Sequence, residues 1–147
     1  MNPIKNILVA VDFVGHDEEL LDCARQMAQK FDAKTWIVHI AAPDPDFVGY
    51  EPGPQYIRDY RAEDLRTEHK NLKTYADRFA AAGIASEGLL IQGPTVETIL
   101  DEATKLKIDL FIVGAHKHGA LHRLFSANTP LELAKKSNIP LLIVPLD

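Results

Sequence analysis

Five short apolar segments, spaced along the whole chain, constrain its fold more than any other feature of the sequence. Within each segment the apolar residues are largely consecutive and do not alternate with polar ones. Such runs are typical of strands in a parallel sheet, because helices cover both faces of that kind of sheet. The segments comprise residues 7–11, 35–40, 88–91, 110–113 and 141–144.

The stretches between these segments carry the spacing of amphipathic helices. Between the first two, apolar residues recur at i, i+4, i+7 and i+11 from Leu20 to Phe31, which predicts one buried helix face. Further helices are predicted at residues 65–79, ended by Gly83 as a C-cap, at residues 96–106, and at a short segment that contains Leu131 and Ala134.

The alternation of strands and helices predicts a single α/β domain over residues 1–147. Its core is a doubly wound, five-stranded parallel sheet with right-handed crossovers and helices on both faces. Open sheets of this class bind ligands at the carboxyl ends of the strands, where the strand order reverses. The residues that follow the apolar segments are therefore the first candidates for a site.

Composition excludes several classes of partner. The formal net charge is −5, and lysine and arginine are scattered, so we expect no binding to nucleic acid. No apolar run approaches the roughly 20 residues of a membrane helix. The single cysteine, Cys23, cannot form an internal disulfide, and residues 1–5 lead directly into a strand without a signal peptide. We expect a cytoplasmic protein that does not bind membranes.

Several catalytic motifs are missing from the sequence. The turn at residues 12–16 lacks the glycine pattern of a dinucleotide site, and the chain has neither a P-loop nor the nucleophile elbow of α/β-hydrolases. A phospho-receiver domain would need an aspartate after the third strand and a lysine after the last, and neither is present. No residue is a convincing general base, so at most a slow ATPase is expected.

Asp12 follows the first apolar segment at the predicted switch point. Its carboxylate could accept hydrogen bonds from the adenine or ribose of a ligand. It could equally cap the following turn or helix, where aspartate is favoured for local reasons. Both interpretations stay open at the level of sequence.

Three histidines follow the fourth apolar segment: His116, His118 and His122. Together they could ligate a metal, but the loop contains no cysteine or carboxylate, so we favour solvated side chains or partial charges beside an anion. His39, inside the second segment, is interpreted as a buried strand histidine with satisfied hydrogen bonds.

The start of the last helix has a purely local explanation as well as a functional one. Thr129, Pro130 and Glu132 form a capping box, with threonine as N-cap and proline at the first helical position. Pro130 removes one amide donor and Glu132 adds a negative charge, and both disfavour an anion there.

The chain resembles the universal stress protein family over its whole length. The resemblance is carried by residues 7–12, 37–40, 92–94, 103–114 and 143–145. It implies the strand order 3-2-1-4-5, a crevice between strands 1 and 4, and a role in the response to stress. In ATP-binding members a loop of the form Gly-x-x-Gly, nine residues, then Gly-Ser/Thr wraps the phosphates.

This loop keeps its first glycine, Gly114, whereas Lys117, Ala127 and Asn128 replace the other three loop positions. A non-glycine residue forced to positive φ costs about 1–2 kcal/mol. The resemblance implies a site for ATP, ADP or AMP, with Mg²⁺, although the loop is degenerate. A non-nucleotide-binding interaction module of the same fold is the alternative. The implied nucleotide-binding residues are Ala10, Val11, Asp12, Ile40, Val113, Gly114, His116, Lys117, Ala127, Asn128 and Thr129.

The last apolar segment, residues 141–144, should lie at an edge of this sheet. An apolar edge strand with unpaired main-chain groups must be covered or paired. We therefore expect a homodimer joined through this strand about a two-fold axis, as the resemblance also implies. The longest irregular stretch, residues 41–56, contains four prolines and is either a surface excursion or a lid over the crevice.

Overall fold

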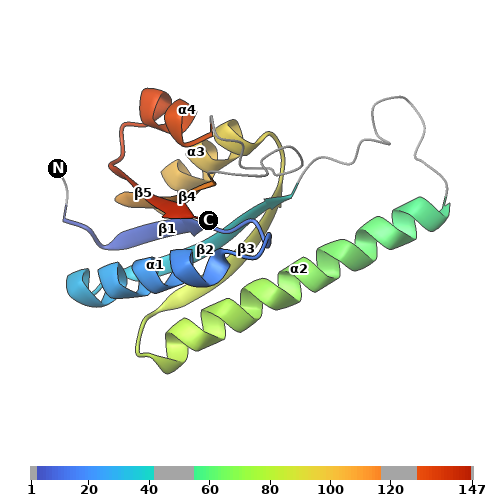
Figure 1. Ribbon diagram of the computed structural model, residues 1–147, viewed down its shortest axis with the longest axis horizontal. Coiled ribbons are helices and arrows are strands. Elements are labelled where there is room, and N and C mark those ends of the chain that lie inside the picture. The colour runs from blue at the N-terminus through green and yellow to red at the C-terminus, as the bar shows by residue number, and fades with distance from the viewer. Residues whose placement is uncertain (1–2, 42–54, 117–128, 147) are drawn as a thin grey trace.

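The computed structural model describes residues 3–41, 55–116 and 129–146 of the chain (Figure 1). Strands and helices alternate along the sequence, as expected. The elements are β1 (Asn6–Ala10), α1 (Asp17–Phe31), β2 (Lys34–Ala41), α2 (Gln55–Ala81), β3 (Ser86–Gln92), α3 (Thr95–Leu106), β4 (Leu110–His116), α4 (Thr129–Lys136) and β5 (Leu141–Leu146).

The strands form one sheet in the order β3-β2-β1-β4-β5, and every neighbouring pair is parallel. The predicted fold class and strand order are confirmed. β1 lies at the centre between β2 and β4, so the strand order reverses between β1 and β4. This places the switch point at the carboxyl ends of these two strands.

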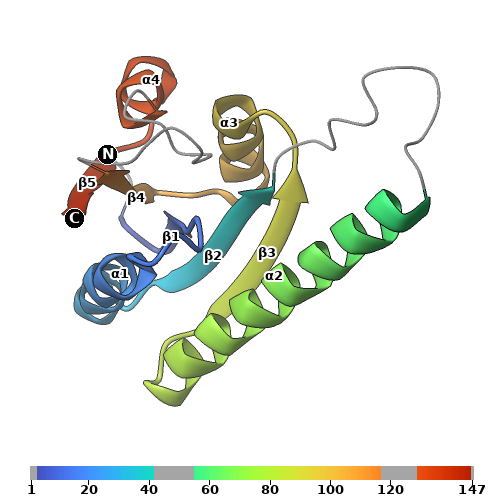
Figure 2. The ribbon, with the colours of Figure 1, turned by 45° about the vertical axis from the view of Figure 1, so that its right-hand side comes forward.

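Helices cover both faces of the sheet, with α1 and α2 on one side and α3 and α4 on the other (Figure 2). Alternate residues of β1 enter different cores: Ile7 and Val9 pack on the α1 and α2 side, and Leu8 and Ala10 on the α3 and α4 side. Residues on both faces of a central strand must therefore be apolar. This is the physical reason for the continuous apolar segments in the sequence.

α2 is much longer than the strands beside it. Its 27 residues extend over about 40 Å, whereas the 7 residues of β3 extend over roughly 23 Å. The amino-terminal part of α2 therefore projects beyond the carboxyl end of the sheet (Figure 2). Gly83 follows the helix with φ +83°, in agreement with the predicted helix end. Among the described residues, no helix is both long and apolar enough to cross a membrane.

Two strands continue further than the sequence indicated. β4 does not end at Gly114 but runs on to His116, and β5 runs past Val144 through Pro145 to Leu146. These additional residues pair with one another, His116 with Leu146 and Ala115 with Pro145. The expectation that β4 ends in a loop at Gly114 is therefore wrong. The register with β5 extends the strand into residues that look like a loop in the sequence.

The short helix α4 buries a residue that its sequence pattern did not single out. Leu133 is fully buried against α3 and the sheet, whereas Leu131 is 53% exposed and Ala134 also faces solvent. The helix has 8 residues, which is too short for its apolar spacing to define a face.

Candidate functional site

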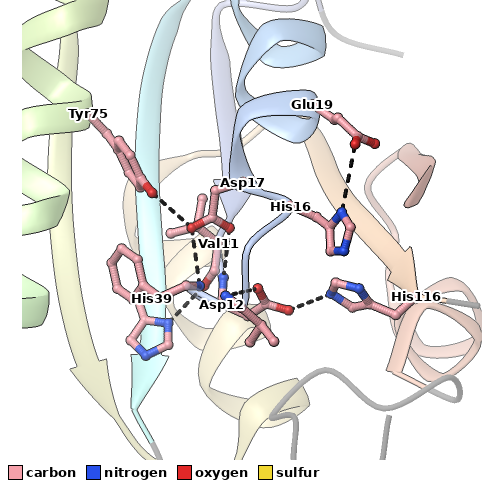
Figure 3. A network of polar contacts seen from close by, with 10 residues as sticks. Val11, Asp12, His16, Asp17, Glu19, His39, Tyr75 and His116 are labelled. Atoms are coloured by element: carbon pink, nitrogen blue, oxygen red, sulfur yellow. Dashed lines mark hydrogen bonds and ion pairs between the residues drawn. The ribbon is translucent and has the colours of Figure 1, made fainter. Parts of the chain in front are cut away.

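The turn after β1, residues 11–14, lies at the switch point and is held by polar contacts from several elements (Figure 3). The Val11 amide donates to the Val38 carbonyl of β2 at 2.9 Å. Phe13 has φ +60°, a left-handed conformation that a bulky side chain adopts only when its surroundings impose it. The contacts around the turn therefore have to stabilise a backbone that would otherwise relax.

Asp17, the first residue of α1, supplies a central part of this stabilisation. Its Oδ1 accepts the Asp12 amide at 3.3 Å, and its Oδ2 accepts the Phe13 amide at 3.2 Å. Oδ2 also accepts the hydroxyl of Tyr75 from α2 at 3.0 Å. Burial raises the pKa of Asp17, and the hydrogen bond from Tyr75 opposes that increase. The carboxyl group thus holds two consecutive peptide units of the turn.

Asp12 connects the turn to β4. Its Oδ1 accepts the Val14 amide at 3.0 Å, and its Oδ2 lies 2.6 Å from Nε2 of His116. Because an ionised carboxylate only accepts hydrogen bonds, Nε2 of His116 is the donor. The side chains of Asp12 and His116 are 7% and 1% exposed. The extension of β4 beyond Gly114 is what brings His116 to Asp12.

The local interpretation of Asp12 as a turn residue is therefore correct, since its carboxylate accepts from the main chain two residues on. A role toward a ligand is compatible with this arrangement. Each carboxylate oxygen has two lone pairs, and each has one described partner. One acceptor direction on each oxygen therefore has no donor among the described contacts.

His39 is a buried strand histidine beside the turn, as predicted. Its Nδ1 donates to the Val11 carbonyl at 2.8 Å. Its Nε2 lies 3.4 Å from Glu68 Oε2 on α2, a buried oxygen that has no hydrogen-bond partner among the described residues. Its ring centroid lies 4.7 Å from that of Phe13. Two residues of α2, Glu68 and Tyr75, thus contact groups that hold the turn.

The apolar residues of the predicted site are brought together. Ala10, Ile40 and Val113 lie in β1, β2 and β4 on the α3 and α4 side of the sheet, and all three are buried in one core cluster. Val11 lies on the opposite face, in the cluster with α1 and α2. Ala10, Ile40 and Val113 therefore belong to the core on the α3 and α4 side, and Val11 to the core on the α1 and α2 side.

Gly114 has a packing role that the sequence did not reveal. It lies within β4, and a Cβ atom at this position would overlap the side chain of Leu146 from β5. The absence of a side chain at Gly114 thus makes room for Leu146. This contact explains the first glycine of the loop motif without a ligand.

The rest of the predicted phosphate loop can be placed only in part. Thr129 is the first residue of α4 and is buried, so the helix boundary lies one residue before the predicted start at Pro130. Lys117, Ala127 and Asn128 lie outside the described residues, as do His118 and His122. Within the described ranges no group of three potential metal ligands occurs, so the metal interpretation receives no support there.

Three residues of the site were not predicted from the sequence: Asp17, Glu68 and Tyr75. Asp17 could have been noticed as an acidic residue at a helix start five positions after Asp12. Glu68 and Tyr75 carried no signal, because their positions on a long helix give no indication of which strand end they reach.

Fold and site together define a single-domain, doubly wound α/β protein with a candidate ligand site at the switch point between β1 and β4. Comparison with known proteins then gives its family. The model of the Universal stress protein family matches residues 3–145, and the chain belongs to this family.

The relatives are similar over their whole length. A universal stress protein of Thermus aquaticus is 33% identical over 141 residues, which are 95% of this chain and 98% of that protein. A universal stress protein in complex with cAMP has a TM-score of 0.68 at 23% identity and covers 97% of this chain and 98% of its own. The universal stress protein of Archaeoglobus fulgidus in complex with dAMP has a TM-score of 0.65 at 18% sequence identity. The match covers 99% of this chain and 100% of the Archaeoglobus chain.

Proposed function

We propose that this universal stress protein binds an adenine nucleotide in the crevice between the carboxyl ends of β1 and β4. The observation that carries the proposal is the Asp12 carboxylate, which is fixed at the switch point by Val14 and His116 and retains acceptor capacity. The base would lie near Ala10, Ile40 and Val113. Two solved proteins of the same fold are complexes with cAMP and with dAMP, which supports a ligand of this class.

A nucleotide with one phosphate fits the sequence better than ATP. Lys117 and Ala127 replace two glycines that would let main-chain amides approach a triphosphate closely, and Pro130 removes a further donor. Lys117 supplies a cation and Asn128 an amide group for a single phosphate. We therefore propose AMP or a related monophosphate as the preferred ligand, with no requirement for Mg²⁺.

Titration calorimetry with AMP, ADP and ATP, each with and without Mg²⁺, tests the proposal. Wild-type protein should bind AMP most tightly, and Asp12→Asn should weaken binding by about tenfold, which is about 1.4 kcal/mol. Asp101→Asn on the exposed surface of α3 is the matched control and should bind as the wild type does. A ligand at 100 times its Kd should also add about 2.7 kcal/mol to stability. Absence of both heat and thermal shift at millimolar nucleotide would refute nucleotide binding.

A second candidate function is an interaction module that has lost the ligand. Packing against Leu146 explains the glycine at position 114, and the contact with His116 explains the Asp12 carboxylate. Neither residue then requires a ligand, which favours this function. In that case Lys117→Ala and Asn128→Ala should leave survival of stressed cells unchanged. Loss of protection by either variant, in stably folded protein, would exclude this function.

We further propose a homodimer joined through β5. The Phe111 amide donates to the Pro140 carbonyl, and Phe111 is in register with Leu141. Successive residues of a strand direct their main-chain N–H and C=O groups to opposite sides. The groups that point away from β4, toward the outer edge of β5, are therefore those of Leu141, Ile143 and Pro145. Ile143 is 43% exposed on this edge. Antiparallel pairing would join Ile143 to the partner's Ile143, and the Leu141 amide to the carbonyl of the partner's Pro145.

A further inference from the structure

We propose that Asp17 and Tyr75 are positioning residues for the nucleotide crevice: they hold the Asp12 turn in its binding geometry without touching the ligand. This inference rests on the proposed function and concerns the same site. It assigns to helix α2, which lies on the outside of the sheet, control over a carboxylate at the sheet centre.

The carboxylate of Asp17 holds two neighbouring main-chain amides of the turn. One carboxylate accepts the amides of Asp12 and Phe13, which are consecutive in the chain. A shift of this carboxylate therefore moves both peptide planes and, with them, the side chain of Asp12. Phe13 has the strained φ angle of +60°, so relaxation of the turn lowers its free energy once these hydrogen bonds are lost.

Tyr75 links Asp17 to helix α2. Tyr75 donates its hydroxyl to Asp17 Oδ2, the oxygen that also accepts the Phe13 amide. Its ring stacks on the Phe13 ring, with centroids 5.9 Å apart and an interplanar angle of 27°. Figure 3 shows Tyr75 reaching Asp17 from α2, on the opposite side of the turn from His116. Tyr75 thus fixes both the carboxylate and the strained residue that it stabilises.

The contacts of Asp17 depend on its negative charge, because its carboxylate accepts all of them. Protonation would turn one of its carboxylate oxygens into a hydroxyl group that donates a hydrogen bond. A hydrogen bond that this oxygen accepts from a main-chain amide of the turn would then be lost. The charged or titratable groups around it are Asp12 of the turn, Tyr75 of α2, and the neighbouring Glu18, which pairs with Arg78 of α2 at 2.6 Å. Asp17 and Tyr75 also line an open cleft of about 270 Å³, so protons can exchange with solvent.

The direction of the pH dependence follows from these contacts. Burial raises the pKa of Asp17 above the ordinary aspartate value of 3.8, and the Tyr75 hydrogen bond lowers it. Ligand affinity should therefore decrease on acidification at a pH above the ordinary range of an aspartate. Removal of the Tyr75 hydroxyl should move this decrease to still higher pH. A purely structural loss would weaken binding equally at every pH.

The experiment measures the Kd of AMP between pH 4 and 8 for wild type, Tyr75→Phe and Ser86→Ala. Ser86→Ala is the matched control, because it also removes one hydroxyl hydrogen bond to α2, the 2.7 Å contact to the Ala76 carbonyl, far from the turn. Tyr75→Phe should weaken binding about three- to tenfold at neutral pH, which is within the range of the net contribution of one typical hydrogen bond, and shift the acid limb upward. Ser86→Ala should leave both unchanged. An unshifted limb in Tyr75→Phe, or an equal effect of Ser86→Ala, would overturn the inference.

A measurement without ligand separates this inference from the proposed function. The amide nitrogen and proton shifts of Asp12 and Phe13, followed by NMR against pH in the free protein, should report the titration of Asp17. Their midpoint should move upward in Tyr75→Phe. If AMP does not bind at all but this shift occurs, the nucleotide proposal is wrong and the positioning of the turn stands. If the midpoint does not move, the positioning inference fails.

Discussion

At the scale of single residues, the contact between Asp12 and His116 shows how a strand extension creates a site. His116 follows Gly114 in sequence and looks like a loop residue, yet as the last residue of β4 it is paired with Leu146 and buried against Asp12. The bond of 2.6 Å between a buried imidazole and a buried carboxylate is of the charge-assisted kind, which is short and strong. Its removal should therefore have a measurable effect on stability.

The substitution His116→Ala should lower the free energy of unfolding by about 2–4 kcal/mol, because it leaves the Asp12 carboxylate buried with one partner fewer. In the double variant Asp12→Asn, His116→Ala, the loss should be smaller than the sum of the single losses, because the Asp12 carboxylate that His116 would leave unpaired is also gone. Urea unfolding of the four proteins measures this coupling. His69→Ala, at an exposed position on α2, is the control and should change stability little. Additive losses would mean that the two side chains do not depend on each other.

The roles of Asp12 and Asp17 could be predicted to different degrees. Asp12 could be singled out from the sequence because it follows a strand at the switch point of an open sheet, and its turn role follows from the local preference of aspartate. The role of Asp17 depends on a turn conformation with φ +60° at Phe13 and on a tyrosine 58 residues further along the chain. Neither leaves a local pattern in the sequence.

At the scale of elements, the apolar periodicity predicted the strands and the buried faces of the longer helices, because each buried face repeats over several turns. It failed for α4, where Leu133 and not Leu131 enters the core, and for the end of β4. In both places the local sequence is too short or too polar to define the element. Contacts with β5 and α3 decide the structure there.

The packing of α2 on β3 depends on Gly88. A Cβ atom at this position would lie 2.9 Å from the Leu72 carbonyl oxygen and 3.0 Å from its carbon, and helix backbone cannot yield as a side chain can. Gly88→Ala should therefore destabilise the protein by about 1–3 kcal/mol through overpacking.

Gly114→Ala provides the comparison, because there the obstructing group is the flexible end of the Leu146 side chain. It should cost less than Gly88→Ala, and thermal or urea unfolding of both variants measures the difference. A larger loss for Gly114→Ala would show that the β4 and β5 contact is less able to adjust than the backbone of α2.

At the scale of the whole molecule, β3 and β5 are the two edge strands of the sheet. α2 packs on β3, whereas β5 carries the exposed Ile143, and no strand among the described residues pairs with the outer edge of β5. Pro145 lies within β5 and removes one donor from this edge, as expected for proline in an edge strand. A second copy of the chain would supply partners for the remaining main-chain groups.

Wild-type protein should accordingly have twice the chain mass of 16.4 kDa in light scattering at micromolar concentration. Ile143→Lys places a charge on the proposed interface and should yield monomers or insoluble protein. Leu131→Lys, which changes an apolar residue on α4 that is 53% exposed against 43% for Ile143, is the control and should remain dimeric. A wild-type mass equal to one chain would contradict pairing through β5.

We propose above all that an adenine nucleotide binds at the carboxyl ends of β1 and β4. NMR titration of isotope-labelled protein with AMP tests it most directly, since it reports both whether and where the ligand binds. The account predicts saturable shifts of the amides of Asp12, Val14, Ile40 and Gly114, with little change along β3 and at the amino-terminal ends of the strands. The absence of shifts at millimolar AMP, or saturable shifts confined to other surfaces, would contradict it.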